Sequence, residues 1–140
     1  MGAGEEILVG RLSLERLYKE VPIFEENARS YAPQAGPLEK IRVIGEETDL
    51  ILFIGTWCPD SRSEAPKLLK ILAMADNPNL VLTIIGVDRD KDDGEGLTRE
   101  HKIERVPTAV FIRGGRELGR IVEHPKRSPE DDFLEIVMGM

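Results

Sequence analysis

The chain contains a single cysteine, Cys58, in the segment Trp57-Cys58-Pro59-Asp60-Ser61. A cysteine thiolate is a strong nucleophile that attacks disulfides and oxidised thiols. One cysteine cannot form an internal disulfide, so Cys58 is either an inert core residue or a free thiol that reacts with groups outside the chain. The secondary structure predicted around Cys58 distinguishes between these interpretations.

The residues on either side of Cys58 place it where a helix begins. Residues 50–54, Leu-Ile-Leu-Phe-Ile, form a continuous apolar run that predicts a strand covered on both faces. Residues 61–75 carry apolar side chains at helical spacing, and Pro59 suits the first position of that helix. The unpaired amides and partial positive charge of a helix N-terminus stabilise a thiolate. We therefore expect Cys58 to be a partly exposed, reactive thiol.

The rest of the chain supplies the other elements of an α/β fold. Apolar residues at helical spacing, interrupted by prolines, predict short helices within residues 11–44. The later elements are expected to be a strand over 80–87, a short helix over 97–103, strands over 108–112 and 118–122 joined at Gly114-Gly115, and a final helix capped by Ser128. A strand, helix and strand in succession predict a right-handed parallel crossover.

This order of elements, with Trp-Cys-Pro between the first strand and its helix, resembles the thioredoxin superfamily. Residues 101–108, which end in Val106-Pro107-Thr108, are similar to the family's short helix and cis-proline loop, and residues 111–117 match its hairpin. The resemblance covers residues 45–140. It implies a three-layer α/β/α sandwich with a central mixed sheet of four to five strands. Residues 1–44 would form an N-terminal helical extension packed on this core, within one compact domain.

The resemblance also implies roles for individual residues. Cys58 would attack a disulfide or an oxidised thiol, and Pro107 would face the thiol as a cis-proline. The backbone of Val106 would then pair with an extended substrate, as in strand addition. The substrate-binding surface is expected to comprise Trp57, Pro59, Asp60, Val106 and Pro107.

Ser61 is the main departure from the family's pattern. Members with a dithiol motif carry a second cysteine three residues after the first, where this chain has Ser61. Ser61 is expected to take part in catalysis by donating a hydrogen bond to the thiolate, but it cannot close a disulfide. An outside thiol must therefore resolve any mixed disulfide on Cys58. Two origins stay open: a natural monothiol protein, which we favour, or a dithiol oxidoreductase whose resolving cysteine was replaced by serine.

Three further residues affect the expected chemistry. Leu52 stands where the family carries a buried acidic residue that helps to move protons, and Glu123 stands where the register predicts a glycine lining the substrate groove. A carboxylate at Glu123 would narrow the groove and disfavour acidic partners. The carboxylate of Asp60 opposes a thiolate at Cys58 and Arg62 could offset it, so the sign of their sum stays open.

Composition excludes several classes of partner. The formal net charge of -7 repels nucleic acid and anionic membrane surfaces, and no apolar run approaches the roughly 20 residues that span a bilayer. The acidic N-terminus lacks the features of a secretory signal, so a soluble, cytoplasmic monomer is expected. His101 and His124 lack partners for a zinc site, residues 88–94 are expected to form a solvated acidic loop, and no metal or cofactor is expected.

The sequence thus predicts thiol-disulfide exchange by a monothiol oxidoreductase with Cys58 as its nucleophile. Its partner would be a disulfide-containing or oxidised protein, or a low-molecular-weight thiol. One alternative is a non-catalytic protein-binding module with the same fold. Another is glutathione or iron-sulfur cluster binding as in monothiol glutaredoxins, but these carry Cys-Gly-Phe-Ser where this chain has Cys-Pro-Asp-Ser.

Overall fold

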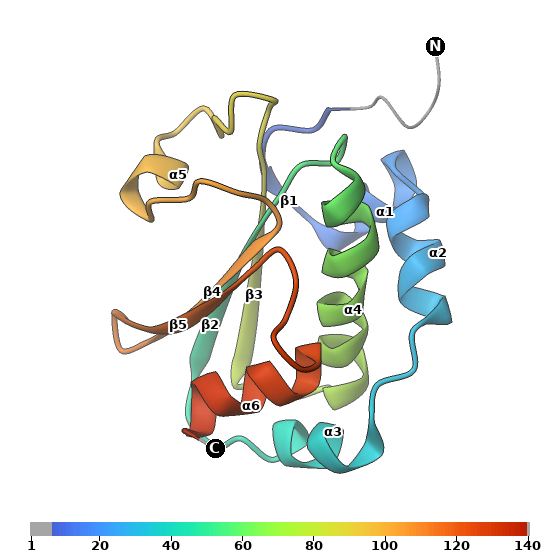
Figure 1. Cartoon of the computed structure of the whole chain (residues 1–140), viewed down its shortest axis with the longest axis vertical. Coiled ribbons are helices and arrows are strands. Elements are labelled where there is room, and N and C mark those ends of the chain that lie inside the picture. The colour runs from blue at the N-terminus through green and yellow to red at the C-terminus, as the bar shows by residue number, and fades with distance from the viewer. Residues whose placement is uncertain (1–6, 140) are drawn as a thin grey trace.

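Strand β2, Thr48–Ile54, lies at the centre of a mixed five-stranded sheet in a computed structural model that describes residues 7–139 (Figure 1). It pairs in parallel with β3 and antiparallel with β4. The strand order is β1-β3-β2-β4-β5. The other elements are β1 Gly10–Leu12, α1 Leu14–Glu20, α2 Ile23–Ser30, α3 Ala35–Arg42, α4 Pro59–Ala75, β3 Leu80–Gly86, α5 Leu97–Glu100, β4 Thr108–Arg113, β5 Arg116–Val122 and α6 Pro129–Met138.

The sheet separates two layers of side chains. Helices α2, α4 and α6 lie together on one face, and the short helix α5 lies on the other (Figure 1). Along β2 the side chains alternate between these layers, as a pleated strand requires. Leu50, Leu52 and Ile54 enter the larger core cluster under the helices, whereas Phe53 enters the smaller cluster on the opposite face. The predicted α/β sandwich with a strand buried on both faces is confirmed.

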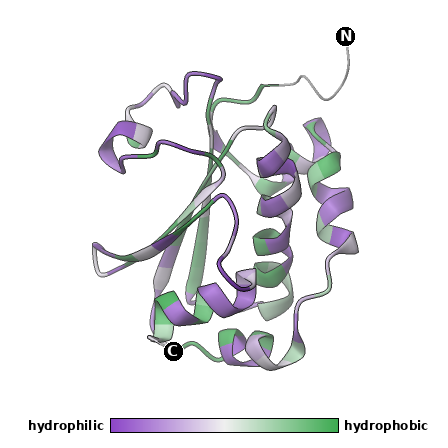
Figure 2. Ribbon diagram, viewed as in Figure 1, coloured by the Kyte–Doolittle hydropathy of each residue, from purple (hydrophilic) through white to green (hydrophobic). Residues whose placement is uncertain are grey.

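The hydropathy of the ribbon follows this layering. Figure 2 shows hydrophobic residues along the central strands and hydrophilic residues on the outer turns of the helices and around α5. Within residues 7–139 no helix is both long and apolar enough to cross a membrane.

Strand β1 was not predicted from the sequence. It pairs antiparallel with β3 and adds an edge to the sheet, with Gly10 opposite Gly86. A Cβ atom at Gly86 would overlap the backbone oxygen of Leu8, so the close approach of this segment requires a glycine there. A strand of three residues is too short to show the alternating pattern that identifies strands in a sequence.

Helix α4 is joined to α2 by a hydrogen bond that compensates for a proline. Pro66 lies inside α4 and has no N–H to donate to the carbonyl of Arg62, one turn earlier. Asn27 of α2 donates its side-chain amide to that carbonyl at 2.8 Å. The N-terminal helices therefore complete the hydrogen bonding of the helix that carries the cysteine.

Element ends differ from the predictions by a few residues. The helix expected over 97–103 ends at Glu100, and Lys102 adopts a left-handed φ of 54° that helical backbone excludes. Helix α6 begins as predicted, because Ser128 accepts a hydrogen bond from Asp131 N at 3.0 Å and Pro129 occupies the first turn. The glycine hairpin between β4 and β5 is also confirmed.

Candidate active site

Cys58 is the N-cap residue of α4. Its backbone is extended, with φ -89° and ψ 125°, and its carbonyl accepts the hydrogen bond from Arg62 N at 3.0 Å that starts the helix. Pro59 follows in the first turn and is exposed. The residue is half-buried and so partly accessible to solvent. The amides of the first turn have no helical partners, and they favour negative charge at this position.

A distant segment lies against the thiol. The Val106–Pro107 peptide bond is cis, and the Cys58 thiol donates a hydrogen bond to the Val106 carbonyl oxygen, with an Sγ–O distance of 3.6 Å. Both Val106 and Pro107 are buried. Thr108 holds the segment in place by donating to the Arg105 carbonyl at 2.6 Å. The fold thus brings residues 48 positions apart to one site.

Trp57 packs beside the thiol and is itself covered by cations. Its indole N–H donates to the Val87 carbonyl at 2.9 Å, and its ring lies close to Gly55. The guanidinium carbon of Arg89 lies 5.1 Å from the ring centroid, and Lys91 Nζ lies 5.9 Å from it. These distances are within the range of cation-π contacts.

The loop that carries Arg89 and Lys91 is held in place by hydrogen bonds to its own carboxylates. Asp93 is 2% exposed, and its carboxylate accepts hydrogen bonds from the backbone of Thr98 and Glu95 at 3.1 and 3.2 Å. Asp88 accepts from the backbone of Asp90 and Asp92. The expectation of a solvated acidic loop is therefore wrong for Asp93, which acts as an internal cap before α5.

Ser61 is fully buried in the first turn of α4. Its hydroxyl oxygen accepts a hydrogen bond from the backbone N–H of Gly55 at 3.0 Å. Gly55 in turn accepts a hydrogen bond from Cys58 N at 2.9 Å. In this structure Ser61 therefore anchors the loop that carries Trp57 and Cys58.

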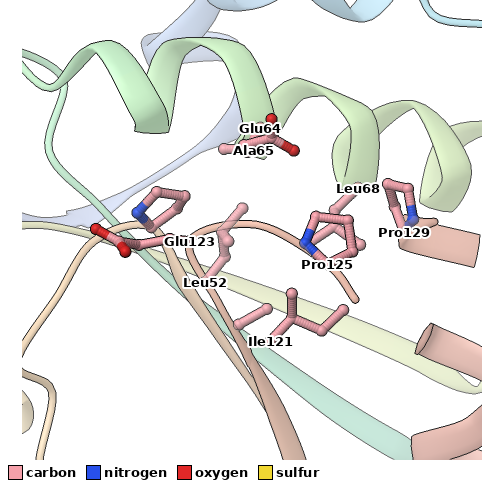
Figure 3. A pocket seen from close by; sticks show the side chains of 10 residues that line it. Leu52, Glu64, Ala65, Leu68, Ile121, Glu123, Pro125 and Pro129 are labelled. Atoms are coloured by element: carbon pink, nitrogen blue, oxygen red, sulfur yellow. The ribbon is translucent and has the colours of Figure 1, made fainter. Parts of the chain in front are cut away.

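A mostly apolar pocket lies between α4 and the segment after β5 (Figure 3). Leu52, where the resemblance led us to look for an acid, forms part of its wall and is fully buried. Two acidic residues also line the pocket, Glu64 on α4 and Glu123 after β5. The remaining lining residues are Ala65, Leu68, Pro107, Ala109, Ile121, Pro125 and Pro129.

Glu123 occupies a backbone conformation that favours glycine. Its φ is 61°, which costs a residue with a side chain roughly 1 kcal/mol. Its N–H donates to the Pro107 carbonyl at 2.7 Å, and its carboxylate lies 3.4 Å from Arg105. This ion pair borders a second, open pocket of about 200 Å³ that contains the thiol. The residues lining that pocket are Trp57, Cys58, Lys91, Glu104, Arg105, Val106 and Glu123.

The sequence did not identify the partner of Asp60. Arg62 donates from Nε to the Thr56 carbonyl at 2.7 Å, whereas His124 Nε2 lies 3.6 Å from Asp60 Oδ1. The two residues of this ion pair are 64 positions apart, so no local pattern could reveal it.

The arrangement suits nucleophilic attack by a thiolate. The half-buried Cys58 lies at the amino end of a helix and lines an open pocket of about 200 Å³. Across residues 7–139 no group of three or more histidine, cysteine or acidic side chains is placed to bind a metal ion.

Comparison with known sequences gives the family of this chain. The family model described as Thioredoxin matches residues 15–131. Thioredoxin H5 of Arabidopsis thaliana is 29% identical over 99 residues, 69% of this chain and 79% of the relative. Mitochondrial thioredoxin of Mus musculus is 26% identical over 107 residues, 76% of this chain, and the match spans 61% of that relative's length.

A solved structure has a similar fold. A Pseudomonas aeruginosa protein of unknown function superposes with a TM-score of 0.57 at 25% identity, covering 81% of this chain and 68% of the other. Since the family model spans most of the chain and the strand order and helix layers fit the same fold, this chain belongs to the thioredoxin family.

Proposed function

We propose that the chain catalyses thiol-disulfide exchange with Cys58 as its single nucleophile. The Cys58 thiolate attacks one sulfur of a substrate disulfide, so that a mixed disulfide forms and the second substrate sulfur leaves as a thiolate that takes a proton. A thiolate from outside the chain then attacks the substrate sulfur of the mixed disulfide. This step releases Cys58 as a thiolate and joins the two outside sulfurs.

The position of Cys58 carries the proposal. The chain's one cysteine is half-exposed at the N-cap of α4, and its sulfur lies within hydrogen-bond distance of the Val106 carbonyl in an open pocket. Membership of the thioredoxin family supports thiol-disulfide exchange in general. The monothiol mechanism follows from Ser61, whose hydroxyl cannot form a disulfide.

The residues around the thiol have the following proposed roles. Ser61 positions the loop before Cys58 through its hydrogen bond with Gly55. The substrate contacts the exposed Pro59, the ring of Trp57 and the first turn of α4 at Asp60. An extended substrate segment pairs with the backbone beside Pro107. The residues of this surface are Trp57, Pro59, Asp60, Val106 and Pro107.

The proposed partner is a disulfide-containing or oxidised protein, or a low-molecular-weight thiol. The net charge of -7 disfavours polyanionic partners. We propose that the protein acts in the cytoplasm as a monomer, where a pool of small thiols resolves the mixed disulfide. Leu52 lines the pocket beside the site and cannot donate a proton. The leaving thiolate therefore takes its proton from solvent or from a residue at the edge of that pocket.

The test is capture of a mixed disulfide. The reduced protein is mixed with a peptide disulfide at neutral pH, and intact mass is measured before and after addition of glutathione. We expect one peptide bound per chain and its release by glutathione, and no adduct with Cys58→Ser. Ser61→Cys is expected to release the peptide without glutathione, because a second thiol three residues away closes an internal disulfide.

The same experiment separates this function from the alternative of a non-catalytic binding module. A folded protein that forms no adduct at neutral pH would show that Cys58 is not a working nucleophile. Peptide binding that survives Cys58→Ser would then favour the binding module.

A further inference from the structure

Asp60 is the acidic residue closest to Cys58 in the sequence. Asp60 lies in the first turn of α4, two residues after the cysteine, and its carboxylate opposes the negative charge of a thiolate. Arg62, the nearest cation along the helix, directs its Nε to the Thr56 carbonyl. The ion-pair partner of Asp60 comes from another element, since His124 Nε2 lies 3.6 Å from Asp60 Oδ1.

The two ring nitrogens of His124 each lie close to a carboxylate. Its Nδ1 lies 3.2 Å from Glu64 Oε2, while its Nε2 faces Asp60. A protonated imidazole has two N–H donors, but a neutral imidazole has only one. The Glu64 side chain is 13% exposed and the Asp60 side chain is 45% exposed, so the loss of a partner costs more at Glu64. When His124 loses its proton, the remaining N–H therefore stays with Glu64, and Asp60 is left unneutralised.

We propose that His124 is a positioning residue for the chemistry of Cys58, which in its protonated form neutralises Asp60 and so favours the thiolate. This inference rests on the proposed function, because it concerns how reactive the same sulfur is. It assigns to a residue after β5 the role that the sequence suggested for Arg62. The nucleophile thereby gains a dependence on histidine protonation that the cysteine alone would not have.

Several other charged groups lie near His124 and the thiol pocket. Histidine is the side chain whose ordinary pKa lies between pH 5 and 8, whereas carboxylates, lysines and arginines titrate outside it. The second histidine, His101, packs on Phe53 in the opposite layer, with ring centroids 5.8 Å apart. The charged groups facing His124 or lining the thiol pocket are Asp60, Glu64, Lys67, Lys91, Glu104, Arg105 and Glu123.

The experiment measures the rate at which iodoacetamide alkylates Cys58 between pH 5 and 9 in low salt. His124→Gln is expected to lower the rate about two- to fivefold at pH 5.5 to 6.5, the range that an exposed ion pair gives, and to leave it unchanged above pH 8. His124→Lys keeps a positive charge and is expected to hold the higher rate across the whole range. Lys126→Gln, the same change of charge on the same segment, is the matched control and leaves the profile unchanged.

Asp60 supplies the decisive comparison. In an Asp60→Asn background, His124→Gln is expected to have no effect, because the charge that the histidine neutralises is gone. A His124→Gln profile that matches the unaltered protein at every pH would overturn the inference and leave the reactivity of Cys58 standing. A Cys58 that reacts at no pH in any folded variant would overturn the proposed function itself. The His124→Lys rescue distinguishes a lost charge from a disturbed fold.

Discussion

Replacement of Ser61 by alanine tests whether this residue holds the active-site loop. Ser61 Oγ is the acceptor for the buried N–H of Gly55, and alanine would leave that donor without a partner. A buried unsatisfied donor costs about 2 kcal/mol, and the better helix propensity of alanine returns about 0.5 kcal/mol. We expect a loss of about 1.5 kcal/mol. The entropy of unfolding for 140 residues is about 0.3 kcal/mol per kelvin, so the unfolding midpoint should fall by about 5 °C.

The control is Ser63→Ala, on the exposed side of the same helix. This variant gains the same helix propensity but loses no buried acceptor, so its midpoint should stay within about 2 °C of the starting protein. Thermal unfolding followed by circular dichroism measures both variants, and iodoacetamide alkylation reports on Cys58. A Ser61→Ala protein as stable as Ser63→Ala would refute the reasoning, because the Gly55 N–H would then find another partner at no cost.

Three further changes test other contacts of the site and its surroundings. A Cβ at Gly55 would lie 2.7 Å from the ring of Trp57, so Gly55→Ala should destabilise the fold by about 1–3 kcal/mol. It should also shift the fluorescence emission of the chain's one tryptophan. Unchanged fluorescence emission would contradict this contact. Burial, together with the hydrogen bond to Glu130, raises the pKa of Tyr31, so the stability from this pair is full below about pH 10 and is lost as the pH rises further. The free energy of unfolding in urea should therefore change less between pH 9 and pH 11 for Tyr31→Phe than for the unaltered protein. An equal change for both proteins would count against a contribution from this hydrogen bond. Leu52→Asp places an unpartnered carboxylate in a fully buried position. The variant should therefore lose more stability at pH 8, where the carboxylate is charged, than at pH 5. An equal loss at both pH values would argue that the pocket admits water.

The parts of the fold that the sequence predicted are those with a local signal. The apolar run of β2, the helical spacing of α4 and the cap at Ser128 each lie within a few consecutive residues. Strand β1 has no such signal, because its three residues join the sheet through the approach of Leu8 to Gly86. Its formation depends on tertiary contact, which a pattern within one segment does not contain.

The candidate site divides in the same way. The position of Cys58 at the start of a helix follows from the residues on either side, and the placement of Val106 and Pro107 near the thiol was implied by the resemblance to the thioredoxin superfamily. The partners of Asp60 and Arg62 did not follow. Arg62 is close to Asp60 in sequence but donates to the backbone of the preceding loop, whereas His124, which contacts Asp60, belongs to the segment after β5. Sequence proximity alone left the balance of charge around Asp60 open, because His124 is 64 positions away in the chain.

The hydrogen bond from Asn27 to the Arg62 carbonyl makes residues 27 and 66 interdependent. Pro66→Ala alone would restore a helical N–H that competes with Asn27 for the same oxygen. Asn27→Ala alone would leave the carbonyl without either donor. Tolerance to change at one position is therefore set by the residue at the other, and the two substitutions made together should cost less than the sum of their separate effects. A library that varies the N-terminal helices without varying α4 would miss such combinations.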